Sequence, residues 1–272
     1  MSATVAGVRL PTVQRRAFAK QFYDGTAMVR RNLIAYKRVP QLLVFSTIQP
    51  IIFVLMFRYV FGGVVQRSLP PGYPYVDFLM PGIWVQTVVF GAIAAAIGLA
   101  TDLKSGLLER FVSLPTTRSA VLVGRTGADM LRNLFVVVLM LVVGWFVGFR
   151  VQTNVFCLIA AMLLVVFFGY ALSWIFATLG LAVKDPETAQ AAAFPVLAPL
   201  VFASIAFVPA DTMPGWLQPW ANHQPVSAVV FAARNLVNGG PTATYVIQAL
   251  LWCVAILCIF VPLGVRTYRK AL

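Results

Sequence analysis

The feature that most constrains this chain is a series of apolar runs, each about 20 residues long and nearly free of charge. A helix of about 20 residues rises about 30 Å, which matches the hydrocarbon thickness of a bilayer. Of the 272 residues, 60% are apolar and 11% are charged, against roughly 25% charged in soluble domains. Because the runs are continuous and do not alternate, they indicate helices and not barrel strands. The sequence therefore predicts an all-α integral membrane protein.

We expect six transmembrane helices, and the basic residues predict their orientation. Sixteen Lys and Arg residues fall on one side, in the N-terminal segment, the loops after the second and fourth runs, and the tail. Only Arg67, Arg150 and Arg234 fall on the other side. Basic loops stay in the cytoplasm, so both termini are predicted to be cytoplasmic, and the net charge of +13 belongs to the membrane face and not to nucleic-acid binding. The expected spans are 42–62, 77–100, 127–149, 155–183, 190–209 and 243–265.

The sequence offers no catalytic, metal or cofactor motif of its own. It lacks GxxxxGK[ST], HExxH and GxSxG, so neither a phosphate-cradling loop nor a hydrolase site is indicated. The single histidine, His223, is expected to cap or pack. Cys157, Cys253 and Cys258 lie in apolar runs without CxxC spacing and are expected to be buried, reduced thiols.

The chain divides into a cytoplasmic N-terminal segment, residues 1–41, and a six-span domain, residues 42–272. Between Arg15 and Arg38, apolar residues recur at helical spacing with basic residues between them. This pattern predicts an amphipathic helix in the headgroup plane. The alternative is a basic tail that only sets topology.

The loop 101–125 contains a short amphipathic helix, predicted over Leu103–Leu114 and ended by Pro115. It is too short to cross the hydrocarbon layer. A cytoplasmic helix held between two spans is suited to receiving force from a motor subunit, and simple packing on the lipid surface is the alternative. Its apolar stripe comprises Leu103, Leu107, Phe111 and Leu114, and its polar face comprises Lys104, Glu109 and Arg110.

Charges also stand at the start of the third span, at Arg125, Asp129 and Arg132. Asp129 and Arg132 are one helical turn apart and are predicted to pair. Charges near hydrocarbon are costly unless they are paired or reach the interface. We interpret these residues as a membrane-boundary anchor, with a direct gating role as the alternative.

The stretch 210–241, between the last two spans, is predicted to form short helices that dip into the outer leaflet. Five prolines between 209 and 241 forbid one continuous helix, and a helical pattern covers Val226–Val237 before the terminator Asn238-Gly239-Gly240. Trp216 and Trp220 suit the aromatic belt of the interface.

Taken together, these segments resemble the ABC-2 family of ABC-exporter permeases, especially the daunorubicin-resistance type of actinobacteria. The resemblance runs in order along nearly the whole chain. It rests on Pro81-Gly82, then Lys104, Gly106, Glu109-Arg110, Leu114-Pro115, Arg118, Gly124-Arg125, Asp129 and Arg132, then Pro214-Gly215-Trp216, Pro219, Asn222, Gln224-Pro225-Val226-Ser227, Arg234 and Gly239.

The resemblance implies a permease subunit in the bacterial plasma membrane that exports a drug, polyketide or lipid. It implies that loop 101–125 docks on a cytoplasmic ABC ATPase, that residues 14–38 form an interfacial helix, and that 211–240 form re-entrant helices. ATP and Mg would be bound by two copies of that ATPase, and a second permease, the same or related, would complete the assembly. An ion-coupled transporter and a non-transporting assembly protein are the alternatives.

For the substrate route we select polar residues in apolar surroundings, namely Gln49, Gln86 and Thr87, together with Trp216 and Trp220. The small residues Gly91, Ala95 and Gly98 are expected to allow close helix approach within the permease pair.

Overall fold

All regular structure in residues 40–106 and 118–271, the part of the chain that the computed structural model describes, is helical. Side chains are described for 47–106 and 124–270. The predicted interfacial helix at 14–38 and most of the predicted helix Leu103–Leu114 lie outside these residues. The elements are α2 (Pro40–Leu55), the π-helix η1 (Met56–Phe61), α3 (Gly62–Val65), η2 (Gln66–Ser68), α4 (Tyr75–Gly91), α5 (Ile93–Lys104), α7 (Arg118–Val147), α8 (Val155–Val183), α9 (Pro186–Phe202), η3 (Ala210–Thr212), α10 (Gln218–His223), α11 (Pro225–Asn238) and α12 (Thr242–Ala271).

Five helical stretches within the described residues are long and apolar enough to cross a membrane. They coincide with five of the six predicted spans. These stretches are Thr47–Ser68, Tyr75–Lys104, Gly124–Val147, Val155–Val183 and Thr242–Lys270.

The predicted span 190–209 is only partly helical. Its helix, α9, is 17 residues long and contains Pro195 and Pro199. It ends at Phe202, and turns follow. The chain after α9 is held by side chains from elsewhere: Gln224 donates to the Ala203 carbonyl at 2.6 Å, and the Ile205 amide donates to Ser227 Oγ at 3.3 Å. The structure thus confirms the helical class, whereas a sixth span remains a prediction.

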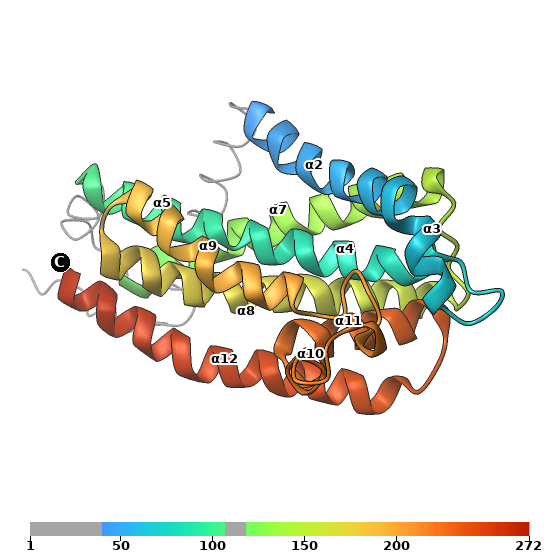
Figure 1. Cartoon of the computed structure of the whole chain (residues 1–272). Coiled ribbons are helices and arrows are strands. Elements are labelled where there is room, and N and C mark those ends of the chain that lie inside the picture. The colour runs from blue at the N-terminus through green and yellow to red at the C-terminus, as the bar shows by residue number, and fades with distance from the viewer. Residues whose placement is uncertain (1–39, 107–117, 272) are drawn as a thin grey trace, which may run out of the picture.

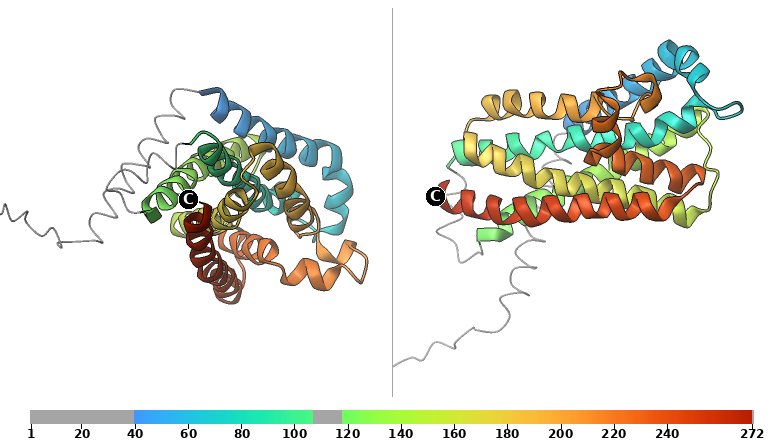
Figure 2. Two further views of the ribbon diagram at one scale, coloured as in Figure 1. Left: turned by 90° about the vertical axis from the view of Figure 1, so that its left-hand side faces the viewer. Right: turned by 60° about the horizontal axis from the view of Figure 1, so that its bottom comes forward.

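The long helices run side by side, with α2 and α12 on opposite sides of the bundle (Figures 1 and 2). The central helix α8 packs against α4, α5, α7, α9, α11 and α12. Gly180 in α8 allows the closest of these approaches, because a Cβ there would lie 2.2 Å from the Ala96 carbonyl oxygen of α5. The end that carries loops 69–74, 148–154 and 239–241 is termed the distal end, and the opposite end, with residue 271, the C-terminal end (Figure 1).

The predicted span 77–100 is built from two helices that meet at Ala92. The Ala92 amide is shared between the Val88 and Val89 carbonyls, at 3.1 and 3.2 Å. At the distal end of this pair, Pro81 cannot donate to the Asp77 carbonyl, and Asn238 donates to it instead, at 2.8 Å. The kink-prone start of α4 is therefore fastened to the end of α11.

The segment 210–241 folds back into the bundle at the distal end. The predicted helix Val226–Val237 is present as α11, which is largely buried against α4, α8 and α12. The predicted terminator is also present, since Gly239 and Gly240 have φ of +88° and +136°. The re-entrant arrangement of this segment stays a prediction.

The three cysteines are free thiols, but only Cys253 is buried. Cys258 is exposed on α12, so the expectation that all three are buried is wrong for it. In a membrane protein, the face of a helix that contacts lipid is exposed when the chain is considered alone, and it can carry apolar and thiol side chains. The sequence alone did not show that Cys258 lies on such a face.

Candidate functional site

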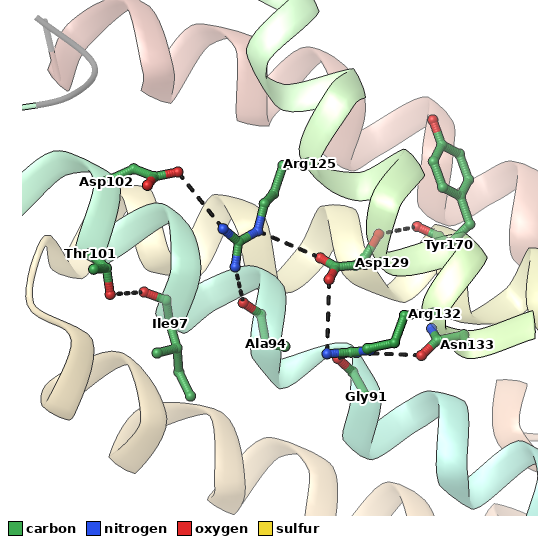
Figure 3. A network of polar contacts seen from close by, with 11 residues as sticks. Gly91, Ala94, Ile97, Thr101, Asp102, Arg125, Asp129, Arg132, Asn133 and Tyr170 are labelled. Carbon is green, nitrogen blue, oxygen red and sulfur yellow. Dashed lines mark hydrogen bonds and ion pairs between the residues drawn. The ribbon is translucent and has the colours of Figure 1, made fainter. Parts of the chain in front are cut away.

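Two acidic and two basic side chains form a partly buried network between α5 and α7 near the C-terminal end (Figure 3). Asp129 is the central member, with Arg125 Nε at 3.9 Å and Arg132 Nη1 at 3.9 Å from its carboxylate. Arg125 Nη1 also lies 3.8 Å from the Asp102 carboxylate. The Asp129 side chain is only 1% exposed. These four residues, the charge network, include the predicted Asp129–Arg132 pair and all three predicted boundary residues.

The two arginines also fasten α7 to the main chain on either side of Ala92. Arg132 Nη2 donates to the Gly91 carbonyl at 2.6 Å, and Arg125 Nη2 donates to the Ala94 carbonyl at 3.2 Å (Figure 3). The glycines of this stretch make room for them. A Cβ on Gly98 would lie 1.6 Å from Arg125 Nη2, and one on Gly91 would lie 2.5 Å from Asn133 Oδ1. Gly91 and Gly98 therefore face α7 of the same chain, a use other than the expected contact within a permease pair.

The charge network stands at the base of the loop predicted to meet the ATPase. Asp102 and Arg125 lie on the two helices that flank that loop, α5 and α7. Their ion pair joins the two ends directly. Of the predicted coupling residues, only Lys104 is described, and Leu107, Glu109, Arg110, Phe111 and Leu114 lie outside the described residues.

Lys104 connects this base to the next turn at the same end of the bundle. Its ammonium lies 2.8 Å from Asp185, which precedes α9. Asp185 also accepts from the Thr188 amide at 3.0 Å and so caps α9. The Lys104 hydrogen bond, followed by those from Thr188, holds the pKa of the Asp185 carboxyl well below its usual range. The pair is solvent-exposed and adds little to stability by itself.

A cavity of about 460 Å³ opens between α2, α4, α5, α7 and α9, and is termed the central cavity. It brings together Gln49, Gln86 and Thr87, three of the residues predicted to line a substrate route. Its lining also includes Arg132 of the charge network. The other two predicted residues lie elsewhere: Trp216 and Trp220 are at the distal segment, 80% and 51% exposed.

The central cavity contains residues that the sequence did not single out for a substrate route. These are Asn133 of α7 and Gln190 and Phe194 of α9. Asn133 and Gln190 could have been selected in the same way as Gln86, because each is an amide side chain in an apolar helix. Phe194 has no such distinguishing feature in the sequence. Two buried polar atoms of the lining have no hydrogen-bond partner, Gln86 Oε1 and Asn133 Nδ2. Both atoms are inaccessible to solvent, so what the cavity itself presents is amide, hydroxyl and guanidinium groups among apolar and aromatic side chains, a lining that suits an amphipathic molecule.

The described residues do not assemble a metal centre. No three His, Cys, Asp or Glu side chains in 40–106 and 118–271 lie close enough to share a metal ion. His223 is exposed, with Nδ1 at 2.8 Å from the Pro219 carbonyl at the end of α10.

Comparison with known proteins agrees with a transport role. The profile of the ABC-2 type transporter family matches residues 24–237. The daunorubicin resistance ABC transporter permease protein DrrB1 of Streptomyces coeruleorubidus is 36% identical over 88% of this chain and 84% of its own length. The probable doxorubicin resistance ABC transporter permease protein DrrC of Mycobacterium tuberculosis is 29% identical over 98% and 95%. A putative transport permease, ycf38 of Cyanophora paradoxa, is 26% identical over 78% and 73%. With the helical bundle, these matches show that the chain belongs to the ABC-2 type transporter family.

Proposed function

We propose that this chain is the transmembrane permease subunit of an ATP-driven exporter, and that its central cavity takes up an amphipathic drug, polyketide or lipid. The observation that carries the proposal is the family membership combined with a cavity in which amide side chains, among them Gln86 and Gln190, lie among apolar and aromatic ones. The curated relatives named for daunorubicin and doxorubicin resistance support an aromatic, oxygen-rich substrate.

In this proposal the C-terminal end of the bundle is cytoplasmic and the distal end faces outward. The basic residues support this, because loop 101–125, Lys184 and the tail all belong to the C-terminal end. The segment 211–240 would then dip into the outer leaflet as a pair of re-entrant helices. Helix α9 and the turns that follow it would form the sixth transmembrane crossing, and both termini would lie in the cytoplasm.

The motor would be a cytoplasmic ABC ATPase that binds ATP and Mg, present in two copies beside two permeases, the same or related. Loop 101–125 would receive its motion, with Phe111 and Leu114 seated on the ATPase and Glu109 and Arg110 at the rim. The ion pair between Asp102 and Arg125 supports this assignment, because a loop closed at its base passes displacement to α5 and α7 together.

The proposal is tested on the permease co-purified with its ATPase and reconstituted in lipid vesicles. Doxorubicin should stimulate ATP hydrolysis and accumulate in inside-out vesicles. Gln86→Leu, which removes an amide side chain from the lining, should raise the half-stimulating doxorubicin concentration by roughly fivefold or more, the worth of one buried hydrogen bond. Basal hydrolysis should be unchanged.

The matched control is Gln248→Leu, the same substitution at an exposed position of α12 outside the cavity. It should leave stimulation as in the parent chain. The proposal of a substrate route through the central cavity is wrong if both variants behave alike. The exporter assignment itself is wrong if ATP hydrolysis proceeds without any substrate movement for every amphipathic compound tested.

A further inference from the structure

A second cavity, of about 670 Å³, lies at the distal end and is termed the distal cavity. Its lining includes Arg67 and Ser68 of η2, Tyr73 of the following loop, Asp211 of η3 and Arg234 of α11. It shares no lining residue with the central cavity. Its most unusual member is Arg234, which is 8% exposed and therefore a nearly buried cation.

The guanidinium of Arg234 has no acidic counterpart among the described residues. None of the ion pairs formed within them includes Arg234, Arg67 or Asp211. The Arg234 guanidinium lies over the Phe78 ring, 3.6 Å from its centroid, which compensates part of the charge. Burial lowers the pKa of Arg234 to about 10, so the side chain remains cationic at neutral pH.

Arg234 does have a structural role, but that role does not require a charge. Its Nε donates to the Phe78 carbonyl and its Nη2 to the Ile205 carbonyl, each at 3.1 Å. Two neighbours perform the same task with neutral amides: Asn238 serves the Asp77 carbonyl and Gln224 the Ala203 carbonyl. The hydrogen bonds of Arg234 therefore explain two of its five N–H groups and leave the buried positive charge unexplained.

The rest of the lining is suited to an anion. Nη1 of Arg234 has no hydrogen-bond acceptor among the described residues. Asn238 already donates to Tyr73 and to the Asp77 carbonyl, and Asn235 donates to the Pro241 carbonyl. The positive charge of the lining therefore comes from Arg234 and from Arg67, which stands exposed at the rim with one opposing carboxylate, Asp211. A buried, uncompensated cation costs several kcal/mol unless an anion or hydrogen-bond acceptor reaches it. A phosphate or carboxylate oxygen in the cavity would supply that acceptor and use the fork of the guanidinium.

We infer that the distal cavity binds the anionic group, a phosphate or carboxylate, of a molecule at the distal face of the permease. This inference goes beyond the proposed export through the central cavity and does not depend on it, because binding is measured on the isolated full-length chain. The anionic group can come from a lipid headgroup or from a free anion, and the probes below separate these sources.

The test uses the full chain in nanodiscs of neutral lipid, with Cys157, Cys253 and Cys258 replaced by alanine. A solvent-sensitive fluorophore on Ser68→Cys, at the exposed rim, reports on this cavity and not on the basic C-terminal end. The probes are dioctanoyl phosphatidic acid, dioctanoylglycerol with the same chains but no phosphate, and inorganic phosphate. Saturable binding of phosphatidic acid without binding of the diacylglycerol is the expected result. Saturation by inorganic phosphate as well would identify a free anion as sufficient.

Removing a positive charge and removing a negative charge at the rim of the cavity should change the affinity in opposite directions. Arg67→Gln should weaken phosphatidic acid binding by roughly two- to fivefold, and Asp211→Asn should strengthen it by a similar factor, as expected for rim charges. Arg150→Gln removes the same charge at the same end of the bundle but outside the cavity lining, and should change nothing. Arg234→Gln should weaken binding by roughly tenfold or more, whereas Arg234→Lys, which keeps the charge but not the fork of the guanidinium, should weaken it less.

The two rim variants keep the test decisive if Arg234→Gln does not fold, since both positions are exposed. Equal binding of phosphatidic acid and diacylglycerol would overturn the inference. So would affinities for phosphatidic acid that do not move in opposite directions in Arg67→Gln and Asp211→Asn.

Discussion

At the scale of single residues, Asp129 is the acidic group of α7 that balances two arginines of the same helix. Arg125 and Arg132 each lie 3.9 Å from the Asp129 carboxylate, and each also donates to a main-chain carbonyl near Ala92. Removing one arginine leaves a neighbour to balance Asp129. Removing the negative charge of Asp129 takes away the carboxylate that both arginines face, one of them the nearly buried Arg132.

We therefore expect Asp129→Asn to lower the stability of the purified chain by roughly 3 kcal/mol or more. The measurement is thermal unfolding in detergent, followed by circular dichroism. Asp211→Asn is the matched control, since it removes the same charge from an exposed side chain. Melting temperatures that fall equally in the two variants would show that the charge network does not stabilise the fold.

The pair Lys104–Asp185 predicts a specific dependence on pH. The pKa of Asp185 is depressed in the folded chain, so its stabilising effect is complete above the pKa of the unfolded chain, about 3.9. The effect is lost only as pH falls below that value. The stability difference between the parent and Asp185→Asn should thus be constant from pH 5 to pH 8 and shrink below about pH 4. A difference that changes between pH 5 and pH 8 would contradict the assignment.

The residue pairings within one helix could be predicted, but those between helices could not. Asp129 and Arg132 are three positions apart, so helical periodicity is enough to predict their contact. The contact of Arg125 with Asp102 joins two helices across a loop, and the donation of Arg234 to Phe78 joins residues 156 positions apart. Such contacts follow from how the helices pack, which no local pattern encodes.

At the scale of elements, the apolar runs predicted long helices well and predicted the ends of interrupted ones poorly. The predicted span 155–183 has the bounds of α8, Val155–Val183, because Asn154 caps it, accepting from the Cys157 amide at 2.8 Å, and Lys184 ends it with φ of +64°. The predicted span 190–209 extends past the end of α9 at Phe202. Gln224 and Ser227, more than 20 positions away, hold the non-helical turn there, so the apolar run alone could not show it.

The contact between α5 and α8 gives a test of how closely these elements pack. We expect Gly180→Ala to destabilise the chain by roughly 1–3 kcal/mol, because the new methyl group would meet the Ala96 carbonyl, a main-chain atom that cannot rotate away. Gly63→Ala is the control, since nothing lies within 4 Å of the added Cβ. The measurement is the thermal unfolding of both variants and the parent chain. Equal melting temperatures for Gly180→Ala and Gly63→Ala would show that α5 and α8 can move apart without loss of stability.

At the scale of the whole molecule, the fold places the central cavity among the long helices and the distal cavity at one end of the bundle, with the charge network toward the other end. The family membership fixes the broad function, and the five candidate spans fix a multi-pass membrane protein. The direction in which the bundle crosses the membrane follows only from the distribution of basic residues.

That direction is tested by labelling in intact cells with an impermeant thiol reagent, after the native cysteines are removed. A cysteine at Pro70, in the distal loop, should be labelled from outside, whereas one at Lys184, at the C-terminal end, should be labelled only after the cells are opened. The reverse pattern would turn the topology around and would place the distal cavity in the cytoplasm.

The junction at Ala92 has a mechanical consequence for the stretch Tyr75–Lys104. Its distal half, α4, is in contact with the Ala206 main chain through Gly82, where a Cβ would lie 2.1 Å from the Ala206 oxygen. Its other half, α5, is in equally close contact with α8. Because these two close contacts are made to different segments, Ala206 and α8, we expect bending of this stretch to concentrate at the joint between its halves. Arg132 and Arg125 of α7 donate to the carbonyls on either side of that joint, so a change in the angle between α4 and α5 would have to move α7 or break these hydrogen bonds.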